Sequence, residues 1–284
     1  MLDPVDTRNP NEVESQVRSI YCKMYPDADQ GFVPRAFAWA AECFSGRYAD
    51  YQPIDARYHD FEHTLQGTLC LTRLLRGRQA AGAKPEVPLR QFELALLAIL
   101  FHDTGYLKKR DDVEGTGAKY TVTHVARSAD FADEFLQKQG YPREAIDAIR
   151  NMISCTGVNA ILQRIPFHDE LERMLGSALA TADLLGQMAA RDYVAKLPIL
   201  HLEFAEAVQH DGRRAARLAA YGTAEELTRH TPTFWQNYVL PRISGDFGGL
   251  YRYLNEPYPD GPNPYLWRIE ENLASIQQRQ QSAQ

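Results

Sequence analysis

Hydrophobic positions recur at the spacing of an amphipathic helix along most of the chain, and no stretch alternates between apolar and polar residues as a strand would. The pattern therefore predicts an all-α fold. Asn11 and Glu14 have the spacing of a capping box, which predicts a first helix that runs to about Tyr25. The other helices expected around a central apolar one are Val33–Tyr48, Tyr58–Gln79, Val122–Lys138, Arg143–Thr156, His168–Ala190 and Arg191–His210.

Loops rich in glycine, proline or charge separate these helices, and the chain divides into three segments. We expect N-terminal helices in residues 1–50 that pack on a core at 51–190, followed by a helical C-terminal extension of the same domain at 191–284. Aromatic residues gather in the extension, where packing against the core is the simplest interpretation and a pocket wall or a homodimer interface stays open. They are Phe234, Trp235, Tyr238, Tyr251, Tyr253, Tyr258, Tyr265 and Trp267.

The stretch LALLAILFHDTGY, Leu94–Tyr106, predicts a buried central helix that ends in the pair His102–Asp103, because Gly105 can terminate a helix. An imidazole and a carboxylate at the mouth of an apolar helix are costly to bury unless something binds them. A divalent metal satisfies both groups at once. The alternative is a helix whose polar end simply reaches solvent.

Three further residues favour the metal. His59 and His63 are four positions apart, so on one helix they would share a face. Asp183 lies in the apolar segment SALATADLLGQM with no lysine or arginine within a helical turn, and a buried carboxylate needs a cation. The alternatives are a solvated stripe for the histidines and the solvent face of a helix for Asp183.

Two other positions are weaker candidates. His124 opens the helix that follows the polar loop Lys108–Tyr120, where it is a ligand of a second metal, a cap or a surface residue. Cys155 lies in an apolar stretch, where a packed core thiol is the simpler interpretation.

Composition and charge set outer limits on function. The chain has 284 residues, 44% of them hydrophobic and 24% charged, which is ordinary for a globular protein. A formal net charge of −6 argues against affinity for nucleic acid or for anionic membranes. Four cysteines without metal-ligand spacing, an acidic N-terminus without a signal-peptide pattern and the absence of a long apolar run predict a cytoplasmic protein with no membrane segment.

Taken together, the ordered set of Tyr58-His59, His63, His102-Asp103 and Asp183 resembles the HD-domain metal-dependent phosphohydrolases, over about half of the chain (residues 50–190). The nearest likeness is to the predicted HD phosphohydrolases of bacteria. They share an opening like Tyr58–Asp60, a phrase like Phe101–Tyr106, and later segments like Arg127–Ala129 and Ile153–Thr156.

The resemblance implies a phosphodiesterase-like helical bundle in which His63, His102, Asp103 and Asp183 hold one divalent metal. By similarity to the cyclic-nucleotide phosphodiesterases, His59 is the proton donor, so that His59 and Asp103 are the catalytic residues. Two imidazoles and two carboxylates suit Mn²⁺, Fe²⁺ or Mg²⁺, with Zn²⁺ or Ni²⁺ less distinguishable. A second ion, with His124 as a ligand, stays open.

The sequence also departs from these relatives. Tyr106 stands where the phosphodiesterases have a further histidine, and Asp60 replaces the asparagine of their opening motif. Cyclic-nucleotide activity is therefore not implied.

We expect a hydrolase that acts on a phosphate ester of a nucleotide or a small phosphorylated metabolite. Lys108, Lys109 and Arg127, with Lys119, are candidate phosphate contacts, and a solvated loop is their alternative role. Two other functions remain open, a di-iron oxygenase on the same fold and a metal-binding sensory module without turnover.

Overall fold

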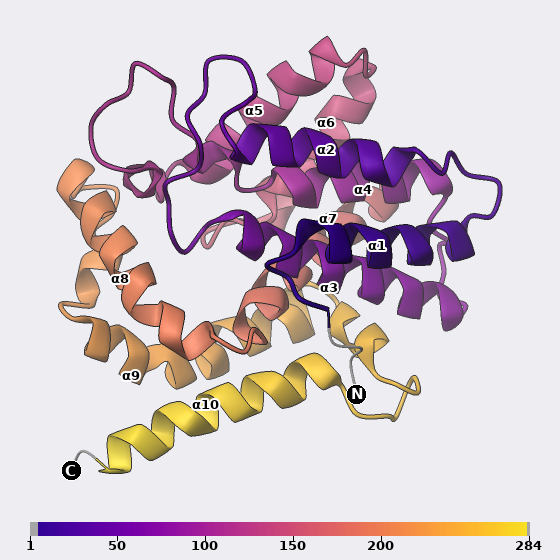
Figure 1. The fold of residues 1–284 in the computed structure, drawn as a ribbon. Coiled ribbons are helices and arrows are strands. Elements are labelled where there is room, and N and C mark those ends of the chain that lie inside the picture. The colour runs from indigo at the N-terminus through magenta and orange to yellow at the C-terminus, as the bar shows by residue number, and fades with distance from the viewer. Residues whose placement is uncertain (1–4, 283–284) are drawn as a thin grey trace.

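The computed structural model of the protein describes residues 5–282, and within them every regular element is helical (Figure 1). Ten α-helices are joined by short 3-10 and π-helical turns, with no strand in the described range. The predicted all-α fold is thus confirmed. Residues 1–4 and 283–284, which belong to the first and third predicted segments, lie outside the described residues.

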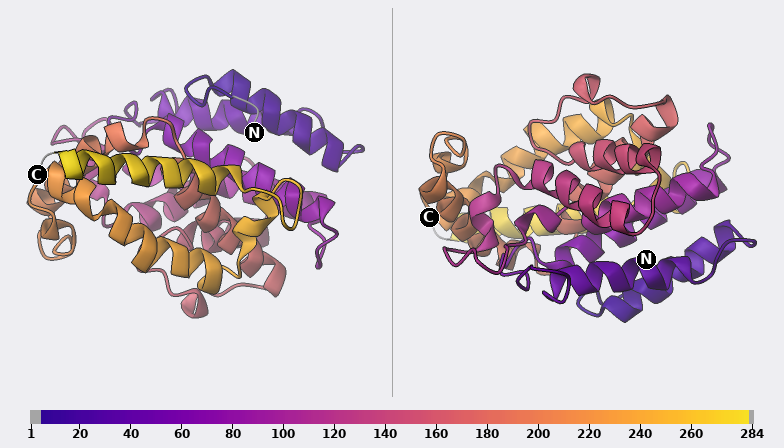
Figure 2. Two further views of the ribbon diagram at one scale, coloured as in Figure 1. Left: turned by 90° about the horizontal axis from the view of Figure 1, so that it is seen from below. Right: turned by 90° about the horizontal axis from the view of Figure 1, so that it is seen from above.

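The helices of the first two segments begin and end close to the predicted positions. They are α1 (Pro10–Met24), α2 (Phe32–Phe44), α3 (Phe61–Ala80), α4 (Leu89–Phe101), α5 (His124–Lys138), α6 (Arg143–Ser154) and α7 (Glu170–Met188). The centre of the molecule is the packing of α3 against α7, with α4 in contact with both. Helices α1 and α2 cover one side of this centre, and α5 and α6 cover the other (Figure 2, right).

Helices α3 and α7 cross at very short range because glycines meet at the crossing. A Cβ on Gly186 would lie 2.8 Å from the backbone of Gln66, and a Cβ on Gly67 would lie 3.7 Å from the Cα of Asp183. A larger residue at Gly186 would force the two helices apart. This close crossing brings α7 within reach of the first turn of α3.

Local hydrogen bonds and one left-handed glycine correct three predicted helix ends. The cap of α1 is Asn9, whose side chain accepts from Asn11 N and donates to Glu12, so Asn11 itself lies inside the helix. Helix α2 stops at Phe44 instead of Tyr48, because Gly46 adopts a left-handed φ of 71°.

The third correction bears directly on the predicted site. Asp60 caps α3, with its carboxylate accepting from His63 N at 2.9 Å, and the helix begins only at Phe61. The prediction that His59 and His63 share one helix was therefore wrong, and His59 precedes the helix.

The C-terminal part forms an arm beside the core. It contains α8 (Tyr193–His210), α9 (Ala224–Phe234), two π-helical turns (Trp235–Val239 and Arg242–Asp246) and α10 (Pro264–Ser282). Helix α10 runs across one side of the molecule and packs on α7 and α9 (Figure 2). Of the helices in the described range, none is both long and apolar enough to cross a membrane.

Candidate metal centre

Four side chains from three helices meet where α4 ends, and we call them the ligand cluster: His63, His102, Asp103 and Asp183. His63 lies in the first turn of α3, and Asp183 lies midway along α7. The pair His102–Asp103 follows the last residue of α4, just before a 3-10 turn at Thr104–Tyr106. The buried apolar helix thus delivers its two polar residues to the core, as the sequence predicted.

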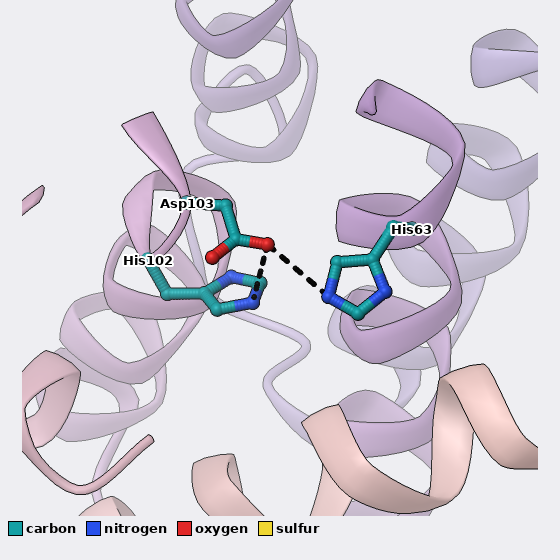
Figure 3. A group of neighbouring side chains, drawn as sticks. All are labelled: His63, His102 and Asp103. Atoms are coloured by element: carbon teal, nitrogen blue, oxygen red, sulfur yellow. Dashed lines mark ion pairs between the residues drawn. The ribbon is translucent and has the colours of Figure 1, made fainter. Parts of the chain in front are cut away.

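The imidazole nitrogens and carboxylate oxygens of the ligand cluster, which are the atoms that could coordinate a metal, point at one another. His63 Nε2 lies 3.1 Å from Asp103 Oδ2 and 3.1 Å from Asp183 Oδ1. His102 Nε2 lies 3.4 Å from each of the same two oxygens. Figure 3 shows the Asp103 carboxylate between the two imidazoles, with both rings turned toward it. Donor atoms of His63, His102 and Asp103 all lie within 4.8 Å of one another, a spacing that can hold a metal ion.

The cluster is buried, and two of its atoms lack a hydrogen bond. His63, His102 and Asp103 are each at most 3% exposed. His102 donates from Nδ1 to Ile99 O at 2.7 Å, which leaves Nε2 as an acceptor aimed into the cluster. Neither His102 Nε2 nor Asp103 Oδ2 makes a hydrogen bond to any described residue. Buried polar atoms are costly without a partner, and a cation at this point would satisfy both. The residues present therefore fit a metal ion.

The electrostatics of the cluster keep its carboxylates ionised. Burial alone would raise the pKa of Asp103 and of Asp183, but the imidazoles of His102 and His63 hold both pKa values below their ordinary range. Burial would likewise lower the pKa of His63, but the two carboxylates outweigh it and raise the pKa to about 10. Both carboxylates are thus ionised in the folded protein, and His63, protonated without an ion, would have to release its proton to bind a metal.

His59 lies next to the cluster and is oriented by a residue that the sequence did not indicate. Its ring centroid is 5.4 Å from that of His63. Its Nδ1 lies 2.6 Å from Oε2 of Glu203 on α8, and the other oxygen of Glu203 accepts from Tyr58 N at 2.7 Å. With Nδ1 engaged by Glu203, the Nε2 atom of His59 is left for other partners.

Tyr106 packs against both His59 and His124, whose ring centroids lie 6.1 Å apart. Its ring stacks on the imidazole of His59 at 4.5 Å and on that of His124 at 4.6 Å. His124 bonds Thr121 O through Nδ1 at 2.6 Å, and its Nε2 lies 3.7 Å from Oδ1 of Asp103. Asp103 therefore turns one oxygen to His63 and His102 and the other toward His124.

Cys155 has a structural environment. It is 1% exposed, its thiol lies 3.5 Å from Asn151 O, and a Cβ on Gly176 would meet its Sγ at 2.6 Å. Burial raises the pKa of the thiol to about 12, so it stays protonated. The structure does not bring Cys155 together with the ligand cluster.

The basic residues predicted to contact phosphate interact with other residues of the same chain. Lys108 forms an ion pair with Asp55 at 3.0 Å, and Lys109 lies 3.9 Å from the ring centroid of Tyr51. Arg127 donates to the carbonyls of Gly105 and Leu107, so it holds the segment that follows the His-Asp pair. Phosphate binding by these three cations stays a prediction.

Two residues of the site were missed at the sequence level, and each carried a signal. Glu203 lies between Leu202 and Phe204 in an apolar helix and is 4% exposed, so the reasoning that selected Asp183 applies to it equally. Gln187 follows Asp183 by four positions, which places both on one face of α7. Its amide lies 3.3 Å from Asp183 Oδ1.

The fold and the site together define an all-helical protein with a buried histidine–aspartate cluster that can hold a metal ion. Residues 10–255 match the Npun_R2479-like family, and the chain belongs to that family. No curated protein and no solved structure matches the chain.

Proposed function

We propose that the protein is a metal-dependent phosphohydrolase that cleaves a phosphate ester of a nucleotide or a small phosphorylated metabolite. The observation that carries the proposal is the ligand cluster, in which His102 Nε2 and Asp103 Oδ2 are buried, converge with His63 and Asp183, and lack hydrogen bonds within residues 5–282. The order and spacing of these residues also resemble those of the HD-domain phosphohydrolases.

The cluster would hold one divalent ion, of which Mn²⁺, Fe²⁺ and Mg²⁺ suit a mixture of imidazole and carboxylate ligands, with Zn²⁺ and Ni²⁺ less distinguishable. When bound, such an ion polarises a phosphoryl oxygen and lowers the pKa of water, which are the two needs of phosphate-ester hydrolysis. Four protein ligands leave coordination positions open on a six-coordinate ion.

The residues around the ion would manage the proton on the leaving group. His59 is 14% exposed at its side chain and borders His63, so it can face both the ion and a bound ester. Glu203 holds its Nδ1, so that Nε2 is the atom from which His59 would donate a proton. Tyr106 stacks on the ring and limits its rotation.

The test is the substitution His59→Asn, which should keep the fold and the metal but lower turnover by roughly 10²–10⁴, the usual effect of a positioned general acid. The loss should be smaller for a p-nitrophenyl ester, whose leaving group needs little protonation, than for an alkyl phosphate. Metal content and turnover of both esters are measured on the same preparations. An equal loss on both esters, or loss of metal along with activity, would contradict the role given to His59.

One observation favours a second candidate, a di-iron oxygenase. Asp103 turns Oδ1 toward His124 at 3.7 Å while Oδ2 faces His63, as a carboxylate that bridges two ions would. A bound pair of irons with a Mössbauer signature, together with oxygen consumption, would support this function, and phosphate release from generic esters would oppose it. A sensory module without turnover would show neither activity.

A further inference from the structure

We infer that Gln187, held in place by Tyr58, is a positioning residue that fixes the Asp183 carboxylate for metal binding. The inference rests on the proposed metal centre and extends it beyond the ligands. It concerns a hydrogen-bonded chain that joins α7 to the segment before α3.

The chain has two links. The Tyr58 hydroxyl donates to Gln187 Oε1 at 2.9 Å, and Gln187 Nε2 donates to Asp183 Oδ1 at 3.3 Å. The oxygen that receives the amide is the one that faces His63 and His102. Gln187 thus acts on the ligand atom itself.

The direction of the amide follows from its neighbours. A Gln187 turned the other way would place its carbonyl oxygen against the Asp183 carboxylate, so that two acceptors would face each other. The Asp183 carboxylate and carbonyl, which can only accept, therefore set the direction of the amide, and the Tyr58 hydroxyl donates to the carbonyl oxygen that this direction presents. Tyr58 is only 3% exposed, so solvent does not compete for its hydroxyl.

The same chain links the ligand to the proposed proton donor. Tyr58 precedes His59, and Glu203 on α8 accepts from Tyr58 N while it holds the His59 ring. A shift of Tyr58 would therefore reach both Asp183, through Gln187, and His59, through the backbone. Partners that orient metal ligands in this way are worth about 10–100-fold in metal affinity.

The test measures the affinity of the metal-stripped full-length protein for Mn²⁺ by titration calorimetry. Tyr58→Phe and Gln187→Met should each raise the Kd for Mn²⁺ by about 10–100-fold, because each frees the Asp183 carboxylate. The double variant should be no weaker than the weaker single variant, since both changes break one chain. Tyr58→Phe keeps the packed ring, so it tests the chain even if Gln187→Met does not fold.

Thr181→Val is the matched control. It removes a buried hydroxyl on α7, two residues from Asp183, that bonds only Ser177 O in the described structure. The Kd for Mn²⁺ should stay within about threefold of wild type, because this hydroxyl does not reach the ligand. An unchanged Kd in both single variants, or additive losses in the double variant, would overturn the inference while the metal centre stands. A wild-type protein that binds no Mn²⁺ or other divalent ion would overturn both.

Discussion

Two of the places where the protein buries charged side chains differ in one respect, because only one of them is left incomplete. In the lysine cluster, formed by Lys108, Lys119, Asp55 and Asp112, each amine reaches a carboxylate and a backbone carbonyl: Lys108 bonds Asp55 and Gly115 O, and Lys119 bonds Asp112 and Glu114 O. In the ligand cluster, the imidazole nitrogen His102 Nε2 and the carboxylate oxygen Asp103 Oδ2 have no hydrogen bond within the described chain.

The difference separates charged groups that are fully partnered within a loop from charged groups that have atoms without a partner among residues 5–282. Burial of ionisable groups is common to both clusters, so burial alone does not mark a functional site. The mark is an atom whose hydrogen-bonding capacity stays unmet after the chain has folded. The two clusters should therefore respond in opposite ways to metal and to mutation.

The largest effect is expected from Asp103→Ala, which removes the carboxylate that lies between both imidazoles. Bound metal should be lost, along with the stabilisation that metal gives the folded state, about 2.7 kcal/mol at a hundredfold excess over Kd. Metal analysis and thermal unfolding with and without chelator measure the two results. Metal content equal to that of the wild type would remove the basis of the assignment.

A loss of similar size but of a different kind is expected in the lysine cluster. Lys119→Met leaves Asp112 without its cation in a site where the lysine side chain is 7% exposed. We expect the free energy of unfolding to fall by about 2 kcal/mol. Urea unfolding should show the same loss in chelator and in excess metal, and a loss that depends on metal would erase the contrast between the clusters.

Smaller effects on metal binding are expected for His124 and Cys155, the two candidate residues outside the ligand cluster. His124→Ala and Cys155→Ser should each retain at least one equivalent of metal, with Kd changed by less than about tenfold, or about 1.4 kcal/mol. His124 faces Oδ1 of Asp103, the oxygen that is turned away from His63 and His102, and Cys155 packs on Gly176. If either variant held half as much metal as the wild type, a two-ion centre would replace the single ion.

The smallest effect concerns a buried carboxylate that is fully partnered. Glu172 accepts from Asn151 and from His168, whose pKa it raises through their hydrogen bond. A raised folded-state pKa stabilises the protein below the unfolded value of about 6.5, and the gain disappears as pH rises through the folded value.

His168→Gln should therefore destabilise the protein at about pH 6 and have less effect at about pH 9, by linkage. The histidine side chain is 44% exposed, so the difference should stay below about 1 kcal/mol. Urea unfolding at the two pH values measures it. A loss that is equal at both would mean that packing, and not protonation, is the contribution of His168.

Three of the four members of the ligand cluster stood out in the sequence because each violates a local rule. His102 and Asp103 end a run of buried apolar residues, and Asp183 interrupts another, so the cost of burial is visible without knowing the fold. Glu203 and Gln187 also carried local signals, but these signals did not reveal their partners. Their partners, His59 and Tyr58, are more than a hundred positions away, and only the folded chain brings them together.

The helix ends show that a local sequence pattern can fit more than one boundary. Asn9 and Asn11 are both followed at the third position by a glutamate, so the capping-box pattern fits either register, and packing of α1 on α3 and α2 accompanies the earlier one. The role of the basic loop likewise depended on residues that are distant in the sequence. Lysine near a predicted metal site suggests phosphate binding, but Asp55 and Asp112 take Lys108 and Lys119 in the folded protein.

The origin of the ligands on three helices also sets an order of events during synthesis. His63, His102 and Asp103 leave the ribosome early, but Asp183 follows Asp103 by 80 positions. At about 5–20 residues per second, this interval lasts about 4–16 s. Until α7 has been made and has crossed α3 at Gly186, the nascent chain offers three of the four ligands. If the cluster holds the proposed ion, full-strength capture of that ion would coincide with closure of the helical core, and metal uptake by a newly made chain would report that the core has assembled.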